Sequence, residues 1–222
     1  MGYTFHFEIP FRNLPFLLNG VLLTLEISVL AIVIGMVIGV IAALGRNAHN
    51  KILRAIAGSY VEFIRNTPFL IQLYFIYFVL TSFGINLTAT TAGVVGLAIN
   101  SGAYIAEIVR AGIESIQKGT IEASYSLGMS RVQCLFYVIF PIAIRRMAPP
   151  LSNQFIGIVL ASSIVSVISA QELTWTASVL ESRTYRSFEI YIVTAILYFI
   201  LAQALSITFT KINKKLFRIG DY

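Results

Sequence analysis

The sequence predicts an all-α, polytopic membrane protein whose chain crosses the bilayer about five times. Of its 222 residues, 57% are hydrophobic and only 12% are charged, and its mean hydropathy is +0.82. A soluble globular domain averages roughly 45–50% apolar and about 25% charged residues. With half the usual charge, a soluble fold would expose large apolar patches and aggregate, so lipid is the expected solvent.

Long uncharged stretches mark the individual spans, at residues 27–45, 66–106, 147–171 and 190–210. A helix needs about 20 mostly apolar residues to cross the roughly 30 Å hydrocarbon core. The second stretch has about twice that length, so it holds two spans, divided near residues 81–86 where Gly84 and Asn86 favour a turn. The predicted spans are therefore residues 16–44, 62–82, 88–112, 147–170 and 189–210.

Basic residues concentrate on one side of these spans. They are Arg46, Lys51, Arg54 and Arg65 after the first span, Arg110, Lys118, Arg131, Arg145 and Arg146 after the third, and Lys211, Lys214, Lys215 and Arg218 after the fifth. The opposite side holds Arg12, Arg183 and Arg186. Lys and Arg in short loops accumulate in the cytoplasm, so we expect the N-terminus outside and the C-terminus inside. The net charge of +6 then faces anionic lipid headgroups, and nucleic acid is not an expected partner.

One segment on the predicted cytoplasmic side, about residues 112–146, is much longer than the other connections. We expect Gly119 to end a helix, Thr120 to cap the next one, and Glu122 to favour its first turn through the helix dipole. Gly128 should end this short helix at about residues 121–127, and Ser130 should start another that runs to Pro141. The residues alone leave open whether this is a docking element or an ordinary interfacial loop.

The same segment resembles the EAA loop of ABC importer permeases. It contains Glu122-Ala123-Ser124, then Gly128 four residues later, then Ile139-Phe140-Pro141. The family pattern is Glu-Ala-Ala, a glycine four residues on, and a hydrophobic-proline pair about a dozen residues beyond. Ser124 replaces the second alanine and Phe140 stands where leucine is common, and both changes are conservative.

The resemblance extends over residues 14–218 and is closest to the polar amino acid branch of these permeases. Each matching piece is weak alone, but together they follow the order of the family. They are Asn19-Gly20 with Thr24-Leu25, Arg65-Asn66-Thr67-Pro68 with Gln72-Leu73, Asn100 to Tyr104 with Glu107 and Arg110-Ala111-Gly112, Pro149 to Ile156, and Ser166-Val167-Ile168.

This resemblance implies a type I ABC importer permease fold in a bacterial inner membrane. Residues 1–15 would be a periplasmic segment, residues 16–218 the transmembrane domain, and residues 219–222 a cytoplasmic tail. A second permease subunit, identical or different, would form the pathway with this chain, and a solute-binding protein would deliver a small polar amino acid. Separate ATPase subunits would hold ATP and Mg and couple through Glu122, Ala123, Ser124, Gly128 and Pro141, with Glu122 pairing with a basic residue of the ATPase.

Polar side chains in the inner halves of the spans are the candidates for substrate contact. They are Asn100, Tyr104, Asn153, Gln154, Ser162, Ser163 and Ser166. The alternative for the serines is hydrogen bonding and close packing between helices. The family often carries a charged residue five positions past the phenylalanine that corresponds to Phe155, with an acid beside it, but here Leu160 and Ala161 are apolar. The chain would then be the non-binding half of a heterodimer, or would serve a substrate that needs no such charge.

The sequence gives no support for an enzyme. The phosphate-binding pattern G-x-x-x-x-G-K-[ST] is absent, so any ATPase activity must reside on a partner chain. His6, His49 and Cys134 show no metal-ligand spacing, and no cofactor is expected on this chain. Among acids near the spans, Glu26 faces the outer half and Glu107 precedes Arg110 by three residues, which predicts a helix-end ion pair. We also find no inverted repeat with broken helices in both halves, the pattern typical of a secondary transporter.

Overall fold

The computed structural model describes residues 3–217, and every regular element in that range is helical. Four helical segments are long and apolar enough to cross a membrane: Leu14–Arg46, Ala89–Glu114, Arg131–Ile168 and Ser187–Leu216. A bent pair, Lys51–Arg65 with Phe69–Ser82, makes a fifth if it is counted as one span. The prediction of about five spans is therefore confirmed.

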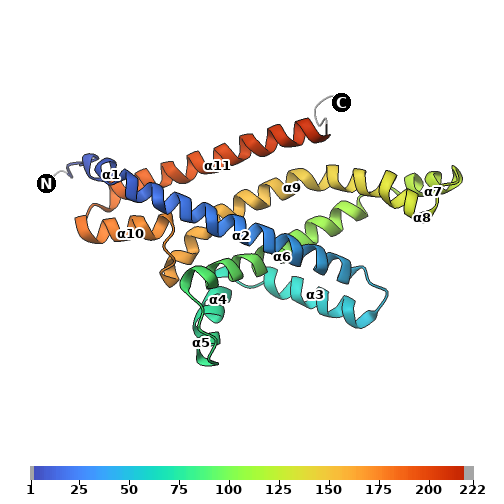
Figure 1. Ribbon diagram of the computed structural model, residues 1–222, viewed down its shortest axis with the longest axis horizontal. Helices are drawn as coiled ribbons and strands as arrows, with labels where there is room; N and C mark the ends of the chain where they lie inside the picture. Colours follow the sequence, from blue (N-terminus) through green and yellow to red (C-terminus); the bar gives the residue numbers. More distant parts are fainter. Residues whose placement is uncertain (1–2, 218–222) are drawn as a thin grey trace.

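The long helices lie side by side in an elongated bundle (Figure 1). Helix α2 (Leu14–Arg46) crosses α6 (Ala89–Glu114), α6 packs on α9 (Phe140–Ala161), and α11 (Ser187–Phe217) lies along the outside of α9. Glycines let α2 and α6 approach closely, because a β-carbon at Gly39 would lie 2.6 Å from the side chain of Ile105. Small residues at a crossing are the usual means of tight packing in lipid.

The second predicted span, residues 62–82, is not one straight helix. Helix α3 (Lys51–Arg65) ends before Pro68, and the chain then turns by 109° into α4 (Phe69–Tyr74), the π-helical turn η1 (Phe75–Val79) and α5 (Leu80–Ser82). Proline lacks an N–H and disfavours helical backbone at the residue before it, which explains the break at Thr67-Pro68. The predicted turn after this segment is present, with Gly84 in the left-handed region at φ 83°.

The break is braced by side chains, as buried backbone in lipid requires. The Nε2 atom of Gln72 donates hydrogen bonds to the carbonyl oxygens of Ile64, at 2.8 Å, and Thr67, at 3.1 Å. Asn100 on α6 in turn donates to Oε1 of Gln72 at 3.0 Å. These bonds replace the helical partners that the two carbonyl groups lose at the bend.

The long inner segment differs from the prediction at both of its helices. Helix α7 (Lys118–Ser126) begins after Gln117, so Gly119 and Thr120 lie inside it rather than ending or capping a helix. Helix α8 (Arg131–Cys134) starts as predicted, at Ser130, through a capping box with Gln133. It does not stop at Pro141, because the π-helical turn η2 (Leu135–Ile139) places that proline in the first turn of α9, where its missing N–H is tolerated.

The structure contains helices that the apolar pattern did not predict. The fourth span ends in the 3₁₀ helix η3 (Ser162–Ile168), and Ser169 reverses the chain at φ 65°. Helix α10 (Leu173–Thr184) follows and packs on α2 and α11, and a short α1 (Glu8–Arg12) precedes α2. Threonine, serine and glutamate interrupt the apolar residues of α10, and its residues lie between the fourth and fifth predicted spans.

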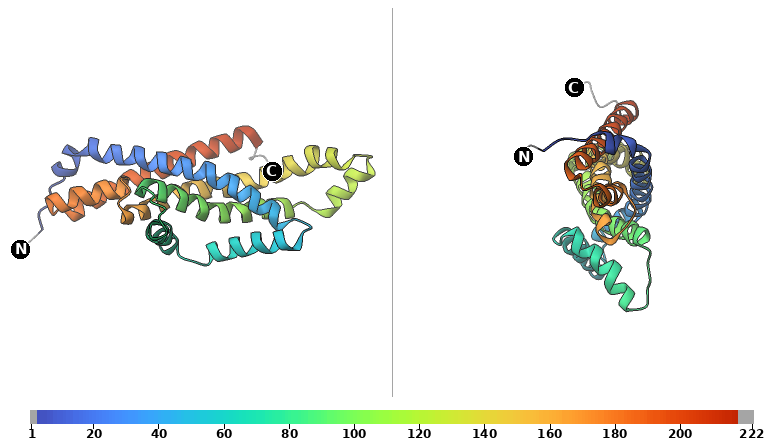
Figure 2. Two further views of the ribbon diagram at one scale, coloured as in Figure 1. Left: turned by 60° about the horizontal axis from the view of Figure 1, so that its bottom comes forward. Right: turned by 90° about the vertical axis from the view of Figure 1, so that its left-hand side faces the viewer.

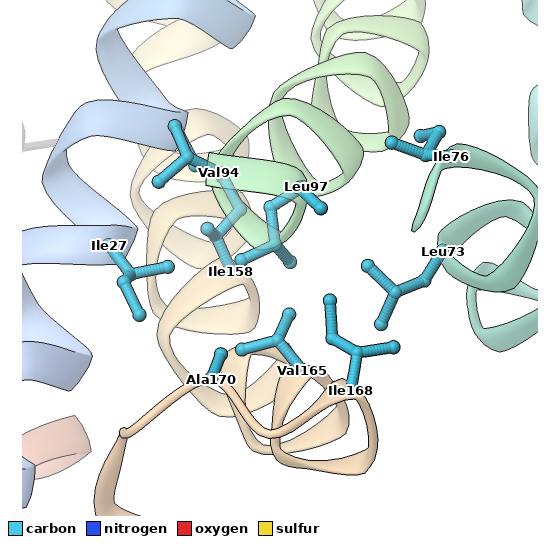
Figure 3. Close-up of a cluster of buried hydrophobic side chains, with 11 residues drawn as sticks. Ile27, Leu73, Ile76, Val94, Leu97, Ile158, Val165, Ile168 and Ala170 are labelled. Carbon is cyan, nitrogen blue, oxygen red and sulfur yellow. The ribbon is translucent and has the colours of Figure 1, made fainter. Parts of the chain in front are cut away.

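A cluster of apolar side chains holds the centre of the bundle together (Figure 3). Its buried members come from α2, α4, η1, α6, α9, η3 and the residue that follows Ser169: Ile27, Ala31, Leu73, Ile76, Ala92, Val94, Leu97, Ile158, Val165, Ile168 and Ala170. Figures 1 and 2 show α1 and α10 at one end of the long axis, and α7 with α8 at the other end. The apolar core lies between these two ends.

Candidate functional site

Helix α7 presents the predicted coupling residues at one end of the bundle, opposite α1 and α10 (Figure 1). Glu122 and Ala123 are exposed, whereas Ser124 is buried and its hydroxyl donates to the carbonyl oxygen of Thr120 at 2.8 Å. A small residue is needed at this third position because the side chain faces the rest of the segment. Serine fits because its hydroxyl finds a partner within the same helix.

Gly128 ends α7 with a Schellman motif, as the sequence indicated. Its φ is 79°, its N–H bonds the carbonyl oxygen of Tyr125 at 2.9 Å, and the N–H of Met129 bonds that of Ser124 at 3.2 Å. This closure fixes the angle between α7 and α8. Pro141 lies apart from these residues, at the start of α9, so the five predicted coupling residues occupy two places.

Exposed apolar side chains surround α7. Leu127 is 80% exposed and Tyr137 is 74% exposed, and Tyr125, Val132 and Phe136 are exposed as well. An apolar group of this size beside a polar helix is typical of a surface that another protein covers. The segment from α7 to η2 thus has the composition of a docking surface.

Glu107 is the centre of an ionic cluster that joins three helices. Its carboxylate contacts Arg46 of α2, Arg110 of α6 at 2.9 Å and Arg65 of α3 at 3.6 Å. Arg110 also contacts Glu114 at 2.5 Å. The predicted ion pair with Arg110 is confirmed, and the structure adds two partners that are distant in sequence. The cluster joins α2, α3 and α6 where they leave the hydrocarbon.

The predicted pathway residues of α6 face the bend between α3 and α4. Asn100 contacts Gln72, as described above, and the ring of Tyr104 lies 5.5 Å from the guanidinium of Arg65 in a cation–π contact. Both side chains are half-buried. They lie beside the broken span, where backbone polar groups are concentrated.

The pathway residues of α9 and η3 are placed differently. Asn153 is exposed and lines a small pocket of about 110 Å³ between α9 and α11, and Gln154 is half-buried. Ser162, Ser163 and Ser166 each donate to a carbonyl oxygen three residues earlier, at 2.7–2.8 Å. Leu160 is exposed and Ala161 is half-buried. The structure therefore does not bring Asn100 and Asn153 together on one face.

Two buried carboxylates at the outer end were missed by the sequence analysis. Glu172 caps α10 by accepting from the N–H of Trp175 at 2.9 Å, and it also accepts from the hydroxyls of Tyr198 and Thr24. Glu189 accepts from the hydroxyl of Tyr3 at 2.5 Å, and this bond raises the pKa of Tyr3. These partners lie far apart in the sequence, so no local pattern joined them.

Comparison with known proteins gives consistent relatives over nearly the whole chain. The chain is 40% identical over 205 residues to the glutamine transport system permease protein GlnP of Escherichia coli, covering 91% of this chain and 94% of that one. It is 39% identical over 209 residues to the probable glutamine ABC transporter permease protein GlnM of Bacillus subtilis, covering 94% and 97% respectively.

Solved structures agree with the fold. The crystal structure of an amino acid ABC transporter with histidines contains a chain with 42% identity and a TM-score of 0.91, over 96% of this chain and all of that one. An inward-facing MetNI methionine ABC transporter matches with a TM-score of 0.75 at 22% identity, over 92% of this chain and 97% of that one, which supports the type I importer permease fold alone. The family model described as "binding-protein-dependent transport system inner membrane component" matches residues 35–218. This chain therefore belongs to the family of binding-protein-dependent inner-membrane permeases, whose ATPase resides on separate subunits.

Proposed function

We propose that this chain is the permease subunit of an importer for small polar amino acids, and that α7 is the element to which a separate ATPase binds. The observation that carries the proposal is the exposed, glycine-closed helix with Glu122 on its surface, surrounded by apolar side chains. The relatives named for glutamine and the solved amino acid transporter support the substrate class. ATP and Mg would bind to the ATPase subunits.

The end of the bundle that carries α7 is proposed to face the cytoplasm. The ends of α2 and α11 on this side carry Arg46, Lys211, Lys214 and Lys215, whereas the opposite end carries Arg12, Arg183 and Arg186. Arg218, which was included in the prediction, lies outside the described residues, as do residues 219–222. Positive residues are retained on the cytoplasmic side, so the N-terminus would lie outside, where a solute-binding protein docks.

The substrate pathway is proposed to run past the bend between α3 and α4. A discontinuous helix exposes backbone polar groups that can bind a polar solute within the membrane. Tyr104 lies beside this bend, whereas Asn153 and Gln154 would contribute on the α9 side if a second permease subunit brings that surface to the pathway. Asn100 and the three serines already have partners in the chain, which favours a structural role for them.

The apolar Leu160 and Ala161 leave two alternatives. A substrate with an uncharged side chain needs no fixed charge at these positions, and in a heterodimer the second subunit would supply the charge. A mass measurement of the detergent-solubilised complex distinguishes a homodimer from a heterodimer, and binding of candidate amino acids to the matching solute-binding protein identifies the substrate.

The coupling assignment is tested by reversing the charge at Glu122. We expect Glu122→Arg to abolish transport in proteoliposomes and to make the rate of ATP hydrolysis independent of substrate. The new arginine would repel the basic residue of the ATPase that Glu122 is proposed to contact. Glu8→Arg makes the same charge change at an exposed site on the opposite end and should leave both activities intact. Unchanged transport in Glu122→Arg would remove α7 from the coupling mechanism.

A further inference from the structure

A polar pocket lies at the inner end of the bundle, away from α7 and from the bend. It has a volume of about 450 Å³ and opens between the end of α2, one face of α3 and the end of α6. Small-molecule sites commonly have volumes of roughly 300–1,000 Å³. The pocket is lined by Arg46, Asn47, Arg54, Ala55, Gly58, Ser59, Glu62, Arg110 and Glu114.

The pocket lining carries three arginines and two glutamates, and two of these five residues form no salt bridge within residues 3–217. Arg46 and Arg110 are already neutralised by Glu107 and Glu114. Arg54 and Glu62 both line the pocket from α3, and within residues 3–217 neither forms a salt bridge. They lie two turns apart on one face, with their Cα atoms separated by about 12 Å. A ligand that carries one negative and one positive group matches this arrangement better than an anion does.

Gly58 lies between these two residues and forms the floor of the pocket. A β-carbon at this position would meet no heavy atom within 4 Å, and the backbone there is ordinary α-helix. Packing therefore does not require a glycine, although glycine in a helix interior costs about 0.5–1 kcal/mol relative to alanine. The absent side chain leaves room above the helix for a ligand.

The other exposed side of α3 is apolar and places the pocket at the membrane surface. Ile52, Ile56 and Phe63 are each more than 60% exposed, and Leu53 is exposed as well. Charged residues at the ends of α2 and α6 mark the headgroup level, since such residues leave the hydrocarbon. Acyl chains can lie along the apolar residues of α3 while a headgroup enters the pocket.

We propose that this pocket binds a membrane lipid whose headgroup joins a phosphate to a primary ammonium, the chemistry of phosphatidylethanolamine. The phosphate would accept hydrogen bonds from the guanidinium of Arg54, and the ammonium would donate to the carboxylate of Glu62. A phosphatidylglycerol headgroup has no cation for Glu62. A phosphatidylcholine headgroup has the same charges, but its quaternary nitrogen has no N–H to donate. The site is independent of the coupling role of α7.

The test uses the purified permease with its ATPase partner, delipidated and then titrated with equal amounts of phosphatidylethanolamine, phosphatidylglycerol and phosphatidylcholine. Native mass spectrometry counts the lipids retained on each permease chain. We expect retention of phosphatidylethanolamine at least about tenfold above the other two, since hydrogen bonds to charged groups separate it from both. Equal retention of the three lipids, or a preference for phosphatidylglycerol, would overturn the proposal.

Two variants and a matched control locate the site. Gly58→Leu should abolish the preference by filling the floor of the pocket, where a β-carbon meets no heavy atom within 4 Å, and Arg54→Gln should reduce retention about tenfold. Lys51→Gln removes a positive charge from the same helix outside the pocket and should change nothing. A preference for phosphatidylethanolamine that persists in Gly58→Leu would refute the assignment of the lipid to this pocket. Free phosphoethanolamine and free glutamine each join an ammonium to an anionic group without acyl chains, and competition by either at equal concentration would show a soluble ligand instead.

Discussion

Replacing Gly39 by alanine should weaken the contact between α2 and α6 by a predictable amount. The new β-carbon would lie 2.6 Å from Cγ2 and 2.7 Å from Cβ of Ile105, and 2.9 Å from the carbonyl oxygen of Gly102. Carbon atoms in contact prefer about 3.5–4.0 Å, so the helices must separate by about 1 Å. Ile105 is fully buried and β-branched, so it cannot rotate away. We expect a loss of about 1–3 kcal/mol, as for other overpacked cores.

Two other glycines make this a graded test. Gly112→Ala would meet Cγ of Met147 at 2.2 Å, but methionine is flexible, so the cost should be smaller. Gly58→Ala meets nothing within 4 Å and should gain about 0.5–1 kcal/mol. In a chain of this length each kcal/mol shifts the melting temperature by about 2–4 °C. Size-exclusion chromatography after heating measures the order of the thermal stabilities of the three variants. A Gly39→Ala protein that melts with the wild type, or a Gly58→Ala protein that melts below it, would refute the reasoning.

Three further outcomes follow from the ionic cluster and from two of the left-handed residues, Ser169 and Gly128. Glu107→Gln should cost about 1–3 kcal/mol because three guanidinium groups lose their shared carboxylate, less than the roughly 3–5 kcal/mol of a fully buried pair. Glu114→Gln, at a side chain 55% exposed, should cost below about 1 kcal/mol, and equal melting shifts would contradict this. Ser169→Gly should raise the free energy of unfolding by about 1 kcal/mol, because glycine removes the strain of the left-handed backbone. A denaturation curve measures this gain, and an unchanged midpoint would contradict it. Gly128→Ala should cost about 1 kcal/mol locally and lower substrate-stimulated ATP hydrolysis, whereas Gly119→Ala, which lies in open space on α7, should not.

Composition and charge were enough to predict the membrane class, the approximate span positions and the capped start at Ser130. These features are local, because each depends on residues next to one another in the chain. The bend at Thr67-Pro68 was predictable in principle, since proline disfavours helical backbone before it, but the unbroken apolar run concealed it. Helix α10 was not predicted because its apolar face is completed by α2 and α11 rather than by its own sequence.

The candidate site was likewise predictable only where its residues are close together in the sequence. Glu122 to Ser124 and Gly128 follow a contiguous motif, and the structure gives each a local reason for its residue type. The Glu107 cluster was only partly predicted, because Arg46 and Arg65 reach it from other helices. Whether a serine serves the solute or its own helix depends on side-chain direction, which spacing does not determine.

The continuity of the helix from Arg131 to Ile168 has a mechanical consequence. Its 38 residues span about 57 Å at the α-helical rise, with Pro149 and Pro150 inside α9, and join the segment next to α7 to the apolar core at Val165 and Ile168. A tilt of about 5° around the core end would displace the other end by about 5 Å. The wider turn at residues 135–139 is a place where this lever can bend, so it would set how much of a displacement near α7 reaches the apolar core.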